Sequence, residues 1–125
     1  EGDYEEVTVE LRTLDEFNFR GVSFIKIDVE GHESDVLAGG QETIRREKPV
    51  MVIEIEQRHL SFPFTDVING ILDMGYEAFF LSRGKLHPFA EFNFDAQQKA
   101  FTAGMTGKRG TLPKTYINNF IFKPG

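Results

Sequence analysis

Cysteine and tryptophan are both missing from this sequence of 125 residues. Without cysteine there can be no disulfide framework, no thiolate metal site and no cysteine nucleophile, and the redox compartment stays undetermined. No apolar run reaches the length that a membrane-spanning helix needs. We therefore expect a soluble protein, with the cytoplasm as the default location.

Positive charge is also scarce, since the formal net charge is −6 and the isoelectric point is near 5.0. Nucleic-acid backbones and anionic membranes would be repelled at long range, so we expect neither as the main partner. A small neutral or cationic ligand fits this charge better. The length and the 40% share of hydrophobic residues predict a single globular domain with one core.

Several common site signatures are absent as well. The chain has no glycine-rich phosphate loop, no His-x-x-x-His metal pair and no Gly-x-Ser-x-Gly elbow. His32, His59 and His87 are scattered along the sequence, and we interpret each as a surface or loop histidine. No metal site is predicted from these patterns.

The most informative stretch runs from Phe24 to Glu33. Apolar and polar residues alternate over positions 24 to 29, which predicts a strand that Gly31 ends. Helical spacing follows from His32 to Lys48, and Pro49 ends it. We attribute the two glycines at positions 39 and 40 of this helix to close packing against a sheet.

A second strand is predicted over residues 50 to 56, so the order strand, helix, strand indicates a parallel βαβ unit. Parallel neighbours would bring Asp28 and Glu30 close to Glu54 and Glu56 at one sheet edge, where open α/β sheets bind ligands. Crowded carboxylates raise one another's pKa or require a cation or hydrogen-bond donors. The simpler alternative for each pair is a solvated strand end.

The remaining elements are predicted more briefly. We expect a strand at 7–11, a capping box at Thr13–Glu16 with a short helix through Phe17, and a helix that is capped by Thr65 or Asp66 at its start and by Gly75 at its end. Strands are expected at 76–81, 85–87 and 117–122, with a two-residue turn at Arg83–Gly84. The many phenylalanines between positions 62 and 94 are interpreted as core and loop packing, although some rings could close over a ligand.

Together these residues resemble a known family. The run Phe24–Glu33, then Val36-Leu37, Gly39-Gly40 and Pro49–Glu54, closely resembles the central signature of the FkbM-type S-adenosylmethionine-dependent methyltransferases. Supporting pieces are Thr13–Asp15, Leu72–Tyr76 and Asn119–Phe122. The resemblance covers most of residues 7 to 123 in the family's order.

The resemblance implies an α/β fold, namely the carboxyl-terminal portion of a Rossmann-like methyltransferase sheet. Residues 24–29 and 50–55 would be its fourth and fifth strands, and 76–81 and 117–122 its last two, the final strand being antiparallel. The family's glycine-rich loop and ribose-binding acid precede the fourth strand and have no counterpart in residues 1–20. We therefore expect residues 1–125 to form one partial methyltransferase domain that lacks the amino-terminal cofactor-binding strands.

The function implied is methyl transfer from S-adenosylmethionine, by analogy to a hydroxyl group of a small molecule or sugar. Asp28 would accept the proton of that hydroxyl or hold it, while Glu30 and Glu54 shape the field around the cationic sulfonium. No residue is assigned to hold the cofactor, and we expect the chain alone to bind it weakly or not at all.

Two alternatives remain open. The chain could be a non-catalytic remnant that binds a partner or forms a homodimer, because the strand at 24–29 would present an exposed sheet edge. The acidic cluster could instead bind a divalent cation such as magnesium.

Overall fold

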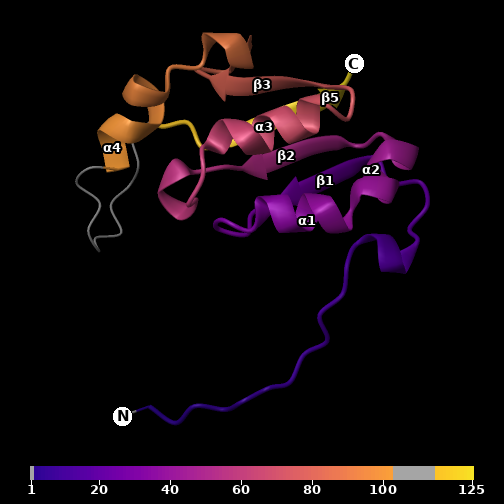
Figure 1. The fold of residues 1–125 in the computed structure, drawn as a ribbon. Helices are drawn as coiled ribbons and strands as arrows, with labels where there is room; N and C mark the ends of the chain where they lie inside the picture. The colour runs from indigo at the N-terminus through magenta and orange to yellow at the C-terminus, as the bar shows by residue number, and fades with distance from the viewer. Residues whose placement is uncertain (1, 103–114) are drawn as a thin grey trace.

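In the computed structural model, which describes residues 2–102 and 115–125, a five-stranded mixed sheet forms the centre of the molecule (Figure 1). The strands lie in the order β1-β2-β5-β3-β4. Their bounds are β1 Phe24–Ile27, β2 Val50–Glu54, β3 Tyr76–Ser82, β4 Lys85–Pro88 and β5 Asn119–Pro124. The expected α/β class is therefore confirmed.

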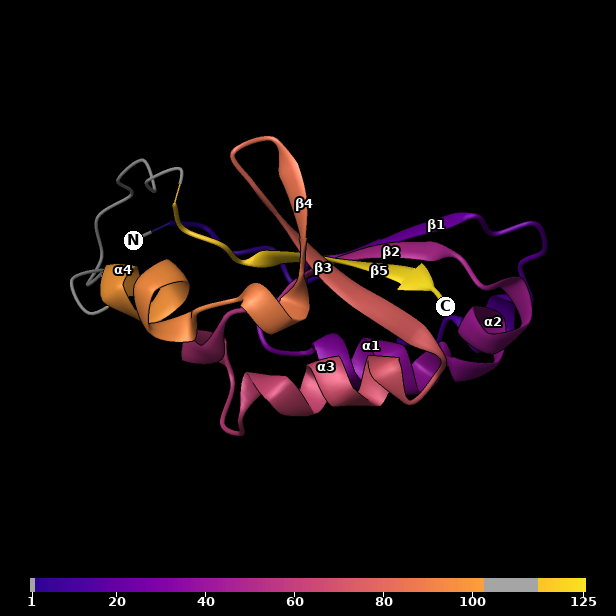
Figure 2. The same ribbon diagram turned by 90° about the horizontal axis from the view of Figure 1, so that it is seen from above.

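The helices α1 (Glu33–Gly39) and α3 (Phe64–Leu72) lie on the same face of the sheet (Figure 2). Helix α2 (Gln41–Glu47) follows α1, and the short α4 (Ala100–Thr102) lies at the other end of the molecule (Figure 1). Within the described ranges, no helix covers the opposite face of the sheet (Figure 2). The domain thus has two layers, with its core between the sheet and α1 and α3.

Alternation along β2 explains where the core lies. Met51 and Ile53 are fully buried, whereas Val52 and Glu54 on the opposite face are only half-buried. Side chains of a strand point alternately to its two faces, so one row packs under the helices and the other faces the uncovered side. Helix α3 contributes a matching apolar stripe, formed by Val67, Ile68 and Ile71.

The strand directions agree with the expected topology. β1 and β2 pair in parallel, in a register that runs from Phe24 opposite Val50 to Ile27 opposite Ile53, which confirms the βαβ unit. β5 pairs antiparallel with both β2 and β3, so the expectation of an antiparallel final strand is also confirmed. Only the bounds shift, because β1 ends at Ile27 and β5 begins at Asn119.

The helix predicted over residues 32–48 is in fact two helices, separated at Gly40. The expected reason for the glycine pair was also wrong, because a side chain on Gly39 would meet Thr13, and one on Gly40 would meet Leu14, at 3.1 Å. The two glycines therefore allow the residues just before the 3₁₀ helix η1 (Asp15–Phe17) to pack closely against them. They do not pack against the sheet. Asp15 fastens that segment by accepting hydrogen bonds from the backbone of Glu42 and Thr43.

The strand predicted at residues 7–11 is absent. This segment is extended but pairs with no strand among the described residues, and its apolar side chains are exposed, at 72% for Val7, 80% for Val9 and 99% for Leu11. Alternation alone cannot make a strand, because a strand also needs a neighbour for its backbone hydrogen bonds.

Two local expectations have clear outcomes. Arg83 and Gly84 both have positive φ values, of 50° and 73°, which confirms a two-residue hairpin turn between β3 and β4. Helix α3 begins at Phe64, so Thr65 and Asp66 lie inside the helix and do not cap it, and Pro63 is the residue at the cap position. The Phe64 N–H donates to the side chain of Gln57 at 2.7 Å, so a distant glutamine performs the capping.

The phenylalanine-rich segment is core, as expected. Phe64, Phe92 and Phe120 lie at the centre of a cluster in which ring centroids are 5.1 to 6.3 Å apart, mostly edge to face. The cluster joins α3 to β5 and to the 3₁₀ helix η3 (Phe89–Glu91). Aromatic pairs of this geometry add stabilisation beyond their buried area.

Gly31, in the turn between β1 and α1, occupies a position that no residue with a Cβ fits without strain. Its φ is +101°, and an added Cβ would lie 2.5 Å from the carbonyl oxygen of His59. We expect Gly31→Ala to destabilise the fold by about 3 kcal/mol, because it adds a backbone clash to an unfavourable conformation. Urea denaturation would measure the change.

Gly84→Ala is the matched control, since Gly84 also has a positive φ, of +73°, but has open space around it. Its cost should be about 1 kcal/mol, from the backbone conformation alone. Equal losses for the two variants would contradict the steric role assigned to the contact with His59.

Candidate functional site

The three carboxylates predicted from the sequence meet at one edge of the sheet. β1 and β2 run in parallel and end side by side, with Ile27 opposite Ile53. Asp28 follows β1 directly, Glu54 is the last residue of β2, and Glu30 lies in the turn between β1 and α1. The two strand ends therefore bring the acids to the position where parallel sheets bind their ligands.

Asp28 and Glu30 are both exposed. Glu30 adopts a left-handed backbone conformation with φ 46°, and Gly31 follows with another positive φ. Two consecutive residues of this kind make a tight turn, which keeps both carboxylates near the strand end. Burial raises the pKa of Glu54 most, and the negative charges of Asp28 and Glu30 raise it further, so the three form one electrostatic group.

Glu33 is hydrogen-bonded to the backbone of this turn. Its side chain is 2% exposed, and Oε1 accepts a hydrogen bond from the Gly31 N–H at 3.2 Å. In the sequence, Glu33 was included only as the last residue of the stretch Phe24–Glu33. The structure adds a buried carboxylate that ties α1 to the turn carrying Glu30.

Glu56 is the most strongly bound acid of the site. It is 4% exposed and accepts hydrogen bonds from the Tyr116 hydroxyl at 2.7 Å, from Asn118 Nδ2 at 3.0 Å and from Arg58 Nε. The antiparallel register places Glu54 opposite Asn119, so the residues just after β2 lie beside those just before β5. This pairing brings the donors at positions 116 and 118 to Glu56.

The two neighbouring glutamates have opposite pKa shifts. Burial, a hydrogen bond with Glu56 and the negative charges of Asp28, Glu56 and Glu30 raise the pKa of Glu54 to about 7. Burial would also raise the pKa of Glu56, but hydrogen bonds from Asn118, Tyr116 and Arg58 outweigh it and hold that pKa at about 2. A proton shared by the pair therefore lies on Glu54, and Glu56 stays ionised.

Gln98 fixes the backbone around Glu56. It is 1% exposed, and its side-chain amide donates to the carbonyl groups of Ile55 at 3.0 Å and Ile117 at 3.2 Å. The same side chain accepts a hydrogen bond from the Gln57 N–H at 2.8 Å. It thus joins the strand ends of β2 and β5 where their ladder of hydrogen bonds finishes.

Sequence reasoning grouped Glu56 with the other acids but did not find its partners. Tyr116 and Asn118 lie about sixty residues away, and Gln98 lies in a segment for which no structure was predicted. The available signal was the tyrosine directly before the last predicted strand and the asparagine at its second position. It carries little weight without knowledge of which strand lies next to β2.

The magnesium alternative finds no support in the described part of the chain. Among residues 2–102 and 115–125, no three histidine or acidic side chains are arranged to hold a metal ion together. Of the two buried or half-buried acids of the site, Glu54 has a raised pKa and Glu56 is held in its ionised form by hydrogen-bond donors. The helices in the same ranges are also too short and too polar for any of them to cross a membrane.

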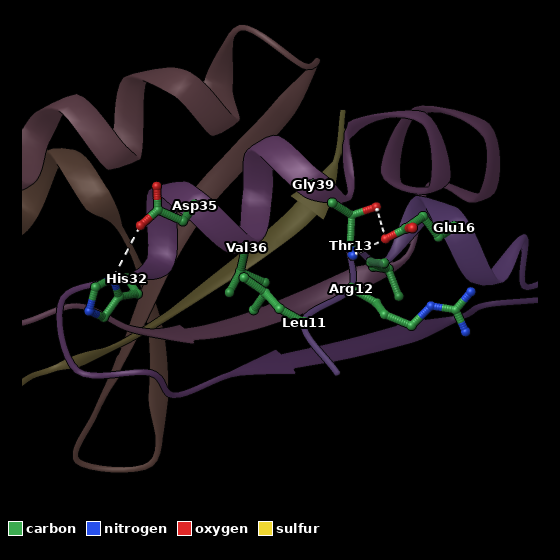
Figure 3. Close-up of a pocket in the computed structure, with 9 residues that line it drawn as sticks. Leu11, Arg12, Thr13, Glu16, His32, Asp35, Val36 and Gly39 are labelled. Carbon is green, nitrogen blue, oxygen red and sulfur yellow. Dashed lines mark hydrogen bonds and ion pairs between the residues drawn. The ribbon is translucent and has the colours of Figure 1, made fainter. Parts of the chain in front are cut away.

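A separate hollow of about 620 Å³ lies between α1 and the segment before η1 (Figure 3). His32 and Asp35 lie at one end, Arg12 and Glu16 at the other, and Leu11 lies near Val36 between them (Figure 3). His32 Nδ1 is 3.1 Å from Asp35 Oδ2, and this pair is mostly exposed. The hollow is lined by none of the acids at the ends of β1 and β2.

Comparison with known proteins agrees with the family suggested by the central signature. Searches of curated proteins and of solved structures gave no significant match. The family model described as the Methyltransferase FkbM domain matches residues 1–78, which is more than half of the chain and includes β1, β2 and the acids at their ends. This chain belongs to the FkbM methyltransferase domain family.

Proposed function

We propose that this chain forms the acceptor side of an S-adenosylmethionine-dependent methyltransferase that methylates a hydroxyl group of a small molecule or sugar. The observation that carries the proposal is the gathering of Asp28, Glu30 and Glu54 at the ends of two parallel strands, in a chain of the FkbM methyltransferase family. The strand order β1-β2-β5-β3, in which only β5 is reversed, supports a Rossmann-like methyltransferase sheet.

The negative charge of this edge of the sheet suits a positively charged cofactor. When bound, S-adenosylmethionine supplies a methyl group on a positively charged sulfur. Asp28 and Glu30 are exposed carboxylates that both act on Glu54, and they would attract that cation and lower the free energy of its complex. We assign no residue of this chain to the adenosine or methionine parts of the cofactor.

The carboxylates divide the work on the acceptor. Asp28 is exposed and would hold the acceptor hydroxyl through a hydrogen bond. Glu54 is half-buried with a pKa of about 7, which is close to the pH at which a general base works best, so it would take the proton. Glu56 stays ionised, and its negative charge and hydrogen bond keep the pKa of Glu54 high.

The first test replaces Asp28 by asparagine in the protein that carries this chain. Loss of the negative charge should lower kcat/KM for methyl transfer by about 10²-fold, because the amide holds and orients the acceptor hydroxyl less well than the carboxylate. Transfer of a radiolabelled methyl group to a panel of sugars and small hydroxyl compounds would measure it.

Asp73→Asn is the matched control, because Asp73 is also an exposed aspartate but precedes the amino end of β3, away from the site. Activity of this variant should equal that of the unchanged protein. If Asp28→Asn also kept full turnover and full cofactor affinity, the role assigned to Asp28 would be wrong.

The second test uses the pH dependence of stability. The raised pKa of Glu54 means that the folded state binds this proton more tightly than the unfolded state, whose value is near 4.5. The stabilisation is complete below that value and is lost as the pH rises through about 7. The free energy of unfolding in urea should therefore fall between pH 5 and 8, and Glu54→Gln should flatten that fall.

Glu77→Gln provides the control, because Glu77 is an exposed glutamate on β3. It should leave the slope unchanged. Carbon-13 NMR of the side-chain carboxyl groups would follow Glu54 directly, and a midpoint near 4.5 would refute the assignment of Glu54 as the proton acceptor.

A further inference from the structure

A second hollow, of about 640 Å³, lies at the β4 side of the sheet. It is formed between the β3–β4 hairpin, the π-helical turn η4 (Asp95–Lys99) and the residues that lead into β5. β4 is the last strand in the order β1-β2-β5-β3-β4, and neither β1 nor the segment before η1 contributes to the described lining. Among the described residues, the polar and charged ones that line the hollow are Ser82, Arg83, Lys85, His87, Gln97 and Thr115.

This hollow is positively charged, although the protein as a whole is acidic. Arg83 and Lys85 are both exposed, and neither forms an ion pair with an acid within residues 2–102 and 115–125. None of the described lining residues is an aspartate or a glutamate. Salt screens exposed charges beyond about 10 Å, so the two cations act on a ligand in the hollow more strongly than the net charge of −6 does. They favour a carboxylate or a phosphate.

Two walls of the hollow are held in place by the rest of the fold. The ring of His87 stacks on the buried Phe80, with ring centroids 5.3 Å apart, and its Nδ1 lies 2.9 Å from Glu91 Oε2. On the wall formed by η4, the Gln97 carbonyl accepts a hydrogen bond from the Ile117 N–H at 2.8 Å. A ligand would therefore meet a preformed site, which reduces the entropy lost on binding.

The arginine of this hollow occupies an unfavourable backbone position. Arg83 has a φ of 50° in the two-residue turn of the hairpin, a conformation in which asparagine, aspartate or glycine is preferred. Folding of the turn therefore gives no reason for an arginine. Ligand binding does give one, because the planar guanidinium group donates to two oxygens of a carboxylate or phosphate at once. Residues in unfavourable backbone conformations gather at ligand sites for this kind of reason.

The hollow and the acids of the candidate site lie at the same end of the sheet. Glu54 at the end of β2 is opposite Asn119, where β5 begins, and β3 ends two residues after Phe80, which is opposite Phe120. Neighbouring strands are about 4.8 Å apart, so the ends of β2 and β3 are separated by about 10 Å. The β3–β4 hairpin also rises from the sheet on the side away from α1 and α3, which is the face that carries Glu54 (Figure 2). A sugar with an acidic substituent can span this separation.

We propose that this hollow binds an anionic group of the methyl acceptor, a carboxylate or a phosphate, while the acceptor hydroxyl lies beside Asp28 and Glu54. The inference rests on the proposed methyl transfer and narrows its acceptor to acidic sugars and similar acidic hydroxyl compounds. Arg83 binds two oxygens of the anionic group, and Lys85 adds a second positive charge. Acids at one end of the acceptor and cations at the other fix the direction in which it lies.

The first experiment measures binding alone. Nitrogen-15 NMR spectra of the protein that carries this chain would be recorded during titration with glucuronic acid, glucose 6-phosphate and neutral glucose. We expect the two acids to shift the amide signals of residues 82–87 and 97, and at least one of them to bind tenfold or more tightly than glucose. Tighter binding of glucuronic acid would identify a carboxylate as the bound group, and tighter binding of glucose 6-phosphate would identify a phosphate.

Arg83→Asn removes the charge without harming the turn, because asparagine accepts a positive φ. Its urea midpoint should not fall, whereas its affinity for the more tightly bound acid should drop about tenfold, as expected for the loss of a hydrogen bond between charged groups. Lys85→Gln should weaken binding in the same direction. Arg45→Gln is the matched control, since Arg45 is an exposed cation of α2 that does not line the hollow, and it should leave the affinity unchanged within about twofold.

Methyl transfer distinguishes a failure of this inference from a failure of the proposed function. In Arg83→Asn, kcat/KM should fall about tenfold for acidic acceptors and stay within about twofold for neutral ones. If neutral acceptors are methylated as efficiently as acidic ones, or if Arg45→Gln weakens acid binding as much as Arg83→Asn does, the anion site is wrong and the proposed function stands.

Two further results have a different meaning. If neither acid shifts the signals of residues 82–87 more than glucose does, the hollow is not an anion site. Acid binding that depends on Arg83, in a protein that transfers no methyl group to any acceptor, would overturn the proposed function and the assignment of the bound acid as its acceptor.

Discussion

The parallel ladder between β1 and β2 is the constraint on which the candidate site depends. It aligns Ile27 with Ile53, so the residues that follow each strand share one edge of the sheet. Nothing in the local sequence brings Asp28 and Glu54 together, because they belong to different strands joined by two helices. The apolar residues beneath, such as Ile53, hold that alignment because a slip by one residue would expose them. The chemistry of the edge is therefore a consequence of core packing.

Placing several acids at one edge of the sheet is unfavourable because their negative charges repel one another. The structure stabilises each acid in a different way. Glu56 receives the donors, Glu54 receives the proton, and Asp28 and Glu30 remain in water. Similar carboxyl groups are thus driven to different ionisation states by their surroundings, a pattern that marks acid–base sites. Tyr116 shares in this arrangement, since burial and its hydrogen bond to Glu56 raise the pKa of its hydroxyl.

Sequence reasoning succeeded where short-range patterns decide the structure. The alternation at 24–29, the helix after Gly31 and the turn at Arg83–Gly84 each depend on a few adjacent residues. It failed where a distant partner decides. The glycines at 39 and 40 admit Thr13 and Leu14, and α3 is capped by Gln57, relations that no local pattern contains. The segment Val7–Leu11 shows the reverse case, in which a good strand pattern pairs with no strand among residues 2–102 and 115–125.

The position of β5 has a consequence for how the chain folds. Residues 119–124 are inserted between β2 and β3, so the two parts of the sheet meet only through a segment made after both of them. During synthesis, the edges of β2 and β3 that pair with β5 stay unpaired until this segment leaves the ribosome. The hydrogen bonds from Tyr116 and Asn118 to Glu56 also cannot form before then. Contacts between residues so far apart in sequence form slowly, and unpaired edges invite wrong partners in the meantime. The strand that completes the core is thus made after the four others, and the edges of β2 and β3 that it covers are unpaired until then.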